Sequence, residues 1–149
     1  MMKAYILLLM TIGLLGCSKY DEADIRHKSI GMYDGVVRHY NLQNGALVYA
    51  GQSETISFTI DKVENPFHLL LVVDGVEFIG TEILGSKNAY NFNLDNVVYK
   101  GITYSGYTGC ENERGIFDGT YLTETRQVIF YLQRLNSQEV LQFSGAWSQ

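Results

Sequence analysis

Residues 56–84 read ISFTIDKVENPFHLLLVVDGVEFIGTEIL, and this stretch decides the fold class. Its first part, Ile56–Asp61, alternates apolar and polar side chains with a period of two, as expected for a strand with one face in a core. The run Phe67–Val73 is apolar, and the Asp74-Gly75 pair after it is typical of a tight hairpin turn. Residues 76–84 then form the returning strand. The stretch therefore predicts antiparallel strands joined by a tight turn.

Strand patterns continue on both sides of this stretch. Asn44-Gly45 predicts another hairpin, between a strand that begins at Met32 and the segment Ala46–Tyr49, and Asn136-Ser137 predicts the turn of the last strand pair. Further strands are expected at Tyr90–Tyr99, Ile116–Thr123, Arg126–Arg134 and Glu139–Trp147. Apolar residues with helical spacing and caps are not found, so no helix is predicted. Eight to ten short strands predict an all-β domain, either a sandwich or a barrel.

The first sixteen residues have the composition of a secretion signal. Lys3 supplies a positive charge, and the apolar run from residue 5 to residue 15 is too short to span a bilayer as a helix. The run ends in Leu14-Leu15-Gly16-Cys17, which resembles the lipobox of bacterial lipoproteins. The resemblance implies cleavage after Gly16 and attachment of a diacylglycerol to the thiol of Cys17. Two or three acyl chains would make the membrane anchor effectively permanent.

Removal of residues 1–16 leaves 133 residues, enough for one domain with one core. We expect a flexible, lipidated linker over residues 17–30 and one β-domain over residues 31–149. Loss of Lys3 leaves ten basic and sixteen acidic residues, a net charge of −6. This charge disfavours binding to nucleic acid. With Cys17 lipidated, Cys110 has no intrachain disulfide partner, so the core must hold the fold.

The predicted linker also bears on location. Residues 18–29 read SKYDEADIRHKS, which is polar and charged throughout. Its segment Lys19-Tyr20-Asp21-Glu22 resembles the surface-export signal of some Gram-negative lipoproteins, although a solvated linker has a similar composition. The expected location is the bacterial cell envelope, at the outer membrane, with the domain either in the periplasm or at the cell surface.

Two motifs at the ends of the predicted domain resemble a known family. Gly31–Gly35 (GMYDG) opens the first strand and Phe143–Trp147 (FSGAW) closes the last one. With the continuous strands between them, they resemble the calycin-like β-barrel domains of small bacterial lipoproteins, which are similar in shape to lipocalins. The resemblance implies an antiparallel up-and-down β-barrel of about eight to ten strands and, as a function, ligand binding. It carries no catalytic residue across, and Tyr33 stands where lipocalins have tryptophan.

The sequence contains no pattern typical of a catalytic or metal site. The three histidines are far apart and lack the spacing of zinc ligands. Cys110 lies beside Glu111 and Glu113, whose charges disfavour the thiolate that a nucleophile needs. These acidic residues and Asp118 do not have the spacing of an established calcium loop. We expect a protein that is not an enzyme and that uses no metal or cofactor.

Tyrosine is abundant, with eleven in the chain. Tyr99, Tyr104 and Tyr107 lie among glycine, serine and threonine, a composition typical of adaptable contact surfaces. Tyrosine is also a residue that simply favours strands. Phe58, on the apolar face of its predicted strand, is a candidate for lining a lumen. These four residues are the candidate contacts with a ligand or a partner.

Two functions fit these observations. A lipid-anchored barrel would bind a small apolar or amphipathic ligand, in a small cavity near one mouth that tyrosine and aliphatic side chains line. Alternatively, it is an envelope interaction module, an accessory subunit or an inhibitor, that binds a protein or a glycan through exposed loops such as residues 99–107. A barrel of about eight strands is just wide enough to be filled by side chains or to hold one small ligand. The state of the lumen therefore discriminates between the two functions.

Overall fold

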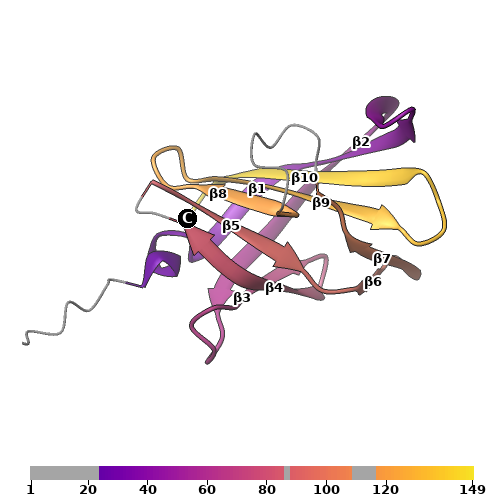
Figure 1. Cartoon of the computed structure of the whole chain (residues 1–149). Coiled ribbons are helices and arrows are strands. Elements are labelled where there is room, and N and C mark those ends of the chain that lie inside the picture. Colours follow the sequence, from indigo (N-terminus) through magenta and orange to yellow (C-terminus); the bar gives the residue numbers. More distant parts are fainter. Residues whose placement is uncertain (1–23, 86–87, 109–116) are drawn as a thin grey trace, which may run out of the picture.

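The structure is a computed structural model, and it describes residues 24–85, 88–108 and 117–149. One short 3₁₀-helix, η1 (Ile25–Lys28), precedes the strands (Figure 1). The strands are β1 (Gly31–Gln43), β2 (Ala46–Lys62), β3 (Leu69–Val73), β4 (Val76–Gly85), β5 (Ala89–Leu94), β6 (Val97–Tyr99), β7 (Ile102–Gly106), β8 (Gly119–Leu122), β9 (Gln127–Arg134) and β10 (Glu139–Trp147).

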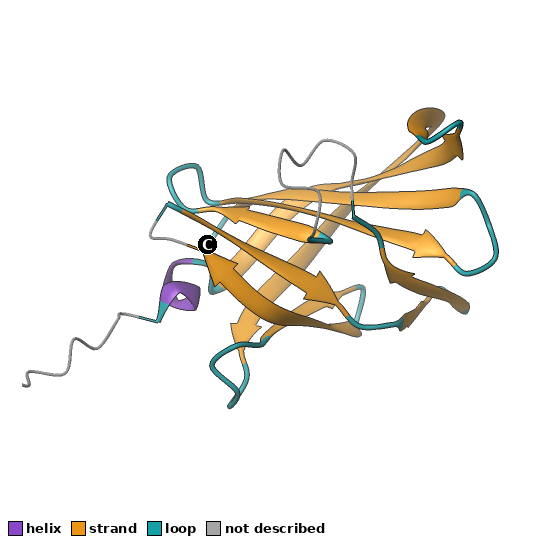
Figure 2. Ribbon diagram, in the orientation of Figure 1, coloured by secondary structure: helices purple, strands orange, loops and turns teal. Residues whose placement is uncertain are grey.

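The strands form one antiparallel sheet that closes on itself (Figure 2). Eight strands are hydrogen-bonded in the order β10-β1-β2-β3-β4-β5-β8-β9, and β9 pairs again with β10. The β6–β7 hairpin is inserted between β5 and β8, and β7 pairs with residues 132–134 of β9. Apart from this insertion and the pair β1–β10, which closes the ring, neighbours in the ring are also neighbours in sequence, so the fold is an up-and-down β-barrel. The predicted all-β class and antiparallel barrel are confirmed.

Two hairpin turns that the sequence predicts are confirmed. Asn44 and Asp74 have φ angles of 52° and 51°, and the glycines that follow them have φ angles of 81° and 77°. Two consecutive positive φ angles characterise the type I′ turn, whose twist matches that of the strands it joins. The turn between β9 and β10 is also confirmed, with Asn136 at a φ angle of 57°.

The prediction of one strand over Tyr90–Tyr99 is wrong. The chain leaves the ladder at Asp95, whose backbone N–H donates to Ile79 O at 3.2 Å, and β6 begins as a new strand. A hairpin that the sequence pattern did not predict causes this break. Lys100 and Gly101 have φ angles of 49° and 77° and turn the chain back into β7.

The two motifs at the domain ends lie side by side and close the barrel. β1 and β10 pair residues 33–37 with residues 147–143 in register. On the inner face of the barrel, next to this strand pair, the ring of Tyr33 stacks on the ring of Phe58 from β2, with centroids 5.4 Å apart. A Cβ atom on Gly145 would lie 2.7 Å from the Phe58 ring, so glycine makes room for the stacked rings.

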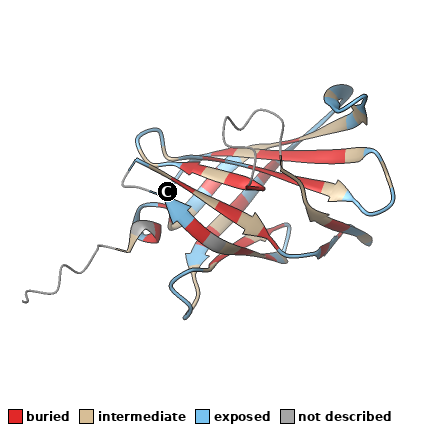
Figure 3. Cartoon of the chain, in the orientation of Figure 1, coloured by how far each residue is buried: buried red, intermediate tan, exposed pale blue. Residues whose placement is uncertain are grey.

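The core lies inside the barrel and receives every second side chain of the strands (Figure 3). In β3, for example, Leu69, Leu71 and Val73 are fully buried, and the residues between them are half-buried. The largest fully buried side chains are Tyr33, Tyr90, Tyr121, Phe78, Phe92, Phe130, Phe143, Leu69, Leu71, Leu132, Leu141 and Val37.

Candidate functional site

The four candidate contact residues do not form one exposed patch. Phe58 is 2% exposed and points inward, as its alternating pattern predicts. Residues 99–107 are not the exposed loop that the sequence suggests, because they form β6, β7 and the turn between them. The alternation in these strands turns Tyr99 and Tyr104 into the core, where they are 2% and 3% exposed. Tyr107, just after β7, is half-buried.

Aromatic rings meet across the lumen. Phe130 and Phe143 stack with centroids 4.6 Å apart, and Phe78 packs edge-on against both, at 6.1 and 5.9 Å. Tyr99 packs against Phe78 and Phe143, and its hydroxyl donates to Asp74 Oδ2 at 2.7 Å. Burial raises the pKa of this hydroxyl. These rings come from β4, β6, β9 and β10, so side chains fill the space that a ligand would occupy.

The small internal cavity predicted near one mouth does not correspond to either of two hollows among the described residues, because both of these open on the outer surface. One lies beside the loop between β2 and β3, and the other lies on the outer wall formed by β1, β9 and β10. The inward positions of the barrel carry rings large enough to touch one another, which leaves little room for such a cavity beside them.

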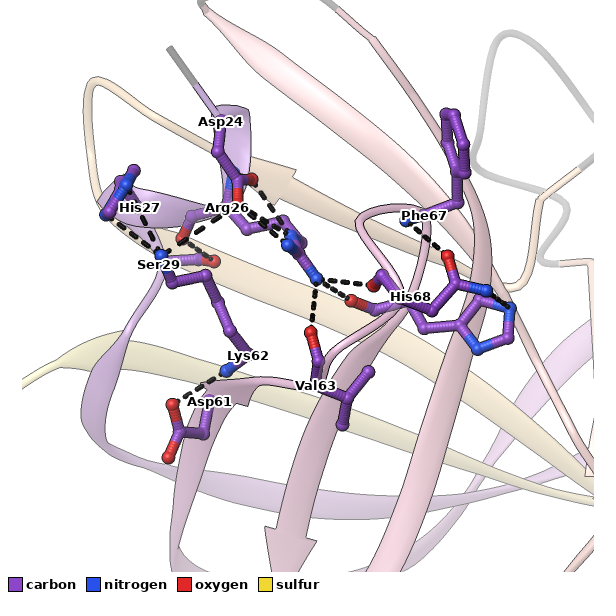
Figure 4. A network of polar contacts seen from close by, with 10 residues as sticks. Asp24, Arg26, His27, Ser29, Asp61, Lys62, Val63, Phe67 and His68 are labelled. Carbon is purple, nitrogen blue, oxygen red and sulfur yellow. Dashed lines mark hydrogen bonds and ion pairs between the residues drawn. The ribbon is translucent and has the colours of Figure 1, made fainter.

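A buried arginine closes one end of the barrel (Figure 4). Nη1 of Arg26 donates to the carbonyl oxygens of Val63, Asn65 and His68 at 3.2, 2.7 and 2.6 Å. Its Nη2 forms an ion pair with Asp24 at 2.7 Å. The hydrogen bonds from Arg26 hold the pKa of the Asp24 carboxyl below its usual value of 3.8. The arginine therefore ties η1 to the loop between β2 and β3.

The prediction of a flexible linker up to residue 30 is wrong for residues 24–30. Arg26 is 5% exposed and Ser29 is fully buried, so this segment belongs to the folded domain. Its burial depends on hydrogen bonds to backbone carbonyls, which a hydrophobicity pattern does not reveal. The predicted signal region ending at Gly16, the lipid attachment at Cys17 and the rest of the linker lie outside the described residues.

Three tyrosines lie beneath η1. The hydroxyls of Tyr33 and Tyr121 donate to the carbonyl oxygens of Ser29 and Lys28, each at 2.6 Å. Tyr90 stacks on Tyr121 with centroids 5.1 Å apart, and its buried hydroxyl has no hydrogen-bond partner among the described residues. Burial raises the pKa of Tyr33 and of Tyr90. These phenols are neutral, and the hydrogen bonds of Tyr33 and Tyr121 hold the η1 segment against this end of the barrel.

Asp118 is a buried carboxylate at the junction of β5, β7 and β8. Its Oδ2 accepts a hydrogen bond from the backbone N–H of Leu94 at 2.9 Å, and its Oδ1 accepts one from Thr108 Oγ1 at 3.5 Å. Burial raises the pKa of this carboxyl above its usual value of 3.8. A side chain at Gly106 would overlap the carboxylate, so glycine makes room for it. The arrangement joins strand ends and offers no reactive geometry.

In the part of the chain that the structure describes, no group of three histidine, cysteine or acidic residues could hold a metal ion. His39 lies between two carboxylates, with Nε2 3.7 Å from Glu54 Oε1 and Nδ1 3.6 Å from Glu139 Oε1. Cys110 and its acidic neighbours lie outside the described residues. The expectation of a free, unreactive thiol there stays a prediction.

The groove on the outer wall of β1, β9 and β10 is the candidate binding site. It has a volume of about 510 Å³ and lies on the face opposite to the filled interior. The side chains that line it from the outward positions of these strands are Asp34, Val36, Arg38, Tyr40, Gln127, Ile129, Gln142, Ser144 and Ala146. We refer to these residues as the outer groove.

A row of polar contacts crosses the outer groove from β1 to β9. Nη1 of Arg38 lies 3.2 Å from Ser144 Oγ and 3.4 Å from Gln142 Oε1. The Tyr40 hydroxyl lies 3.4 Å from the same Gln142 oxygen, and Gln142 Nε2 donates to the Tyr131 hydroxyl at 2.8 Å. The sequence pattern alone does not predict this site, because its residues come from strands far apart in the chain. Their outward position in the alternating pattern was the only local signal.

The fold and the outer groove define a class of protein, a small antiparallel β-barrel with a filled interior and an open groove of mixed polar and apolar lining on its outer wall. No protein-family model and no curated protein matches the chain. Among solved structures, it is similar to a redesigned β-barrel, with a TM-score of 0.45 and 11% identity, covering 85% of this chain and 96% of that one. A helix long and apolar enough to cross a membrane is not found among the described residues.

Proposed function

We propose that this protein is a lipid-anchored lipoprotein of the bacterial envelope, with a calycin-like barrel, and that it acts as an interaction module. It binds its partner on the outer surface of the barrel. The filled lumen carries the proposal, because the rings of β4, β6, β9 and β10 occupy the place where a carrier would hold its ligand. A carrier of small apolar molecules, the alternative function, needs a hollow of roughly 300 Å³ or more.

The lipobox-like sequence at Cys17 supports the lipid anchor. Six residues lie between Cys17 and Asp24, where the described domain begins, and the seven Cα-to-Cα steps span about 25 Å at full extension. The end of the barrel that η1 closes would therefore lie near the membrane. The surface available to a partner is the opposite end and the adjoining outer wall.

The β1–β2 hairpin projects at that opposite end (Figure 1). β1 starts next to η1 and runs for thirteen residues, roughly 40 Å, to Gln43. Residues 46–55 of β2 are exposed or half-buried, and β2 pairs with β3 only from Phe58 onward. Among the described residues, one edge of this part of β2 therefore has no neighbouring strand.

The unpaired edge has the composition of a strand-addition site. Residues 46–53 (ALVYAGQS) contain no charge and no proline, two of the devices with which proteins protect a sheet edge, and the register irregularity of this segment is confined to residues 50–52. Val48 and Tyr49 are 43% and 49% exposed. The rings of Tyr40 and Tyr49 lie 5.7 Å apart between centroids and connect the hairpin to the outer groove. An extended segment of a partner would bind there through backbone hydrogen bonds.

Photo-crosslinking in living cells tests the proposal. A diazirine amino acid replaces Tyr49 at the β1–β2 hairpin. In a matched control it replaces Glu124, which is exposed in the turn between β8 and β9, at the end of the barrel that η1 closes. We expect a discrete crosslinked product from position 49 that is absent from position 124 and is reduced by Cys17→Ala. Identical products from both positions, or none from position 49, would contradict an interaction module that acts through its outer end.

A further inference from the structure

Arg38 lacks an acidic partner among the described residues, as do Lys28 in η1 and Arg126, whose guanidinium lies over the Trp147 ring; of these three, Arg38 is the one that lines the outer groove. Four ion pairs engage other cations: Arg26 and Lys62 with Asp24, Lys100 with Glu54, and Arg134 with Glu139. Among the described residues, no carboxylate lies within ion-pair distance of Arg38, whose contacts are the neutral oxygens of Gln142 and Ser144. A guanidinium carries five N–H donors in a fixed fork. Most of these donors therefore have no protein acceptor in the described residues.

The surroundings hold this guanidinium in place. Gln142 is 8% exposed and is fixed by its hydrogen bond to the Tyr131 hydroxyl, so its oxygen orients both Arg38 and Tyr40. Asp34 is the acidic side chain of the outer groove, and it lies four residues before Arg38 on β1, about 13 Å away along the strand. Its Oδ1 accepts a hydrogen bond from Ser57 Oγ at 2.7 Å. The groove thus has one cationic end, fixed before any ligand arrives, which reduces the entropy lost on binding.

The chemistry of the groove indicates the ligand. An arginine fork matches a carboxylate, which accepts two parallel hydrogen bonds from it. Gln127 and Ser144 offer amide and hydroxyl groups, and Tyr40 offers a ring, which suit the hydroxyls and the flat face of a sugar. The volume of about 510 Å³ is within the range of small-molecule sites. A peptide would need a deep apolar pocket for an anchoring side chain, and this groove is open, with polar and apolar side chains side by side in its lining.

We propose that the outer groove binds a carboxylate-bearing sugar, a uronic-acid unit of a glycan, with its carboxylate on Arg38. The sugar ring lies along Tyr40, and its hydroxyls contact Ser144 and Gln127. The assignment rests on the proposed function, because it names the chemistry that one part of the contact surface recognises. It is tested separately, with purified protein and defined saccharides.

Isothermal titration calorimetry of the full chain in detergent micelles measures binding of three probes: trigalacturonic acid, its uncharged methyl ester and triglutamate. We expect the acid to bind and the ester to bind at least about tenfold more weakly, because the ester cannot accept the charged fork. Arg38→Ala should weaken binding of the acid by about tenfold or more, and Arg38→Lys by less. Arg134→Ala, which removes an exposed arginine outside the groove, should leave it unchanged.

Each result decides the assignment. Undetectable binding of the acid, equal binding of the ester, or binding that survives Arg38→Ala would overturn it, and tighter binding of triglutamate would replace the sugar by an acidic peptide. Circular dichroism establishes that Arg38→Ala is folded, and Arg38→Lys serves as the decisive variant if it is not. If the sugar does not bind but the crosslink at position 49 still forms, only the sugar assignment is overturned. Loss of that crosslinking overturns the interaction module.

Discussion

Two tyrosines beneath η1 differ in whether their buried hydroxyl forms a hydrogen bond. The Tyr121 hydroxyl donates to Lys28 O, whereas the Tyr90 hydroxyl has no partner among the described residues. A buried hydroxyl without a partner costs about 1–3 kcal/mol. Tyr90→Phe should therefore raise the free energy of unfolding by about 1 kcal/mol, and Tyr121→Phe should lower it by about 1 kcal/mol. Urea denaturation, followed by the fluorescence of the one tryptophan, measures both changes, and a loss of stability in Tyr90→Phe would contradict this description.

Asp118 is the residue whose charge state matters most for stability. Burial raises the pKa of its carboxyl, so the folded state binds the proton more tightly than the unfolded state, whose pKa is close to 3.8. The contribution of this group to stability is greatest below pH 3.8 and is lost as the pH rises through the raised pKa. Asp118→Asn keeps an acceptor for Leu94 but removes the charge.

The stability of Asp118→Asn relative to the natural protein should therefore increase between pH 4 and pH 7. Asp118→Ala removes the acceptor as well and should cost about 1–3 kcal/mol at either pH, because the Leu94 N–H stays buried without a partner. Thermal or urea unfolding at several pH values measures the difference. A constant difference between Asp118→Asn and the natural protein over this range would show that the carboxyl is not perturbed.

Among the elements, η1 depends on one side chain. Arg26 connects three carbonyl oxygens and the Asp24 carboxylate, so Arg26→Ala should cost roughly 3 kcal/mol, because it leaves these groups without their partner. Arg26→Lys keeps the charge but not the fork, and it should recover only part of the loss. Lys28→Ala, in the same helix and exposed, is the matched control.

Hydrogen exchange at the backbone of Ser29 reports the same change locally. In Arg26→Ala this amide should exchange faster, whereas in Lys28→Ala it should stay protected. The pKa of Asp24 is lowered by Arg26, so this stabilisation is present above pH 3.8 and is lost as the pH falls through the lowered pKa. Equal protection of Ser29 in both variants would show that η1 is held by other contacts.

The elements that could be predicted from the sequence are those with a local signal. The β3–β4 hairpin combines an apolar run with Asp74-Gly75, whose residues readily adopt positive φ angles. The β6–β7 hairpin uses Lys100 in the same conformation, and lysine is not typical of such turns, so the strand pair was missed. η1 was missed for a related reason, since its burial depends on an arginine that reaches backbone carbonyls in another part of the chain.

At the scale of the whole molecule, alternation predicts which residues point inward but not whether they meet. Phe78 and Phe143 are far apart in sequence, and their contact follows only from the diameter of the closed barrel. The outer groove likewise depends on β1 lying beside β10 and β10 beside β9. The barrel class was therefore predictable, whereas the filled lumen and the groove required the closed sheet.

The lipid anchor is a prediction about the whole molecule and its location. Because the thiol of Cys17 is the expected acceptor of the lipid, Cys17→Ala should abolish metabolic labelling of the protein with palmitate and leave the signal region uncleaved. Cys110→Ala is the matched control and should be labelled normally. Palmitate labelling that survives Cys17→Ala would show that the lipobox resemblance misleads.

The central claim is that the barrel interior is closed to ligands and that binding takes place outside. Fluorescence titration of residues 18–149, which retain every described residue, with an apolar naphthylamine probe tests this claim most directly. We predict no saturable binding by the natural sequence, and a new site in Phe130→Ala, in which removal of a ring opens space at a cost of about 3–5 kcal/mol in stability. Saturable binding of the probe by the natural sequence, weakened by Phe58→Trp, would contradict the claim and restore the ligand carrier.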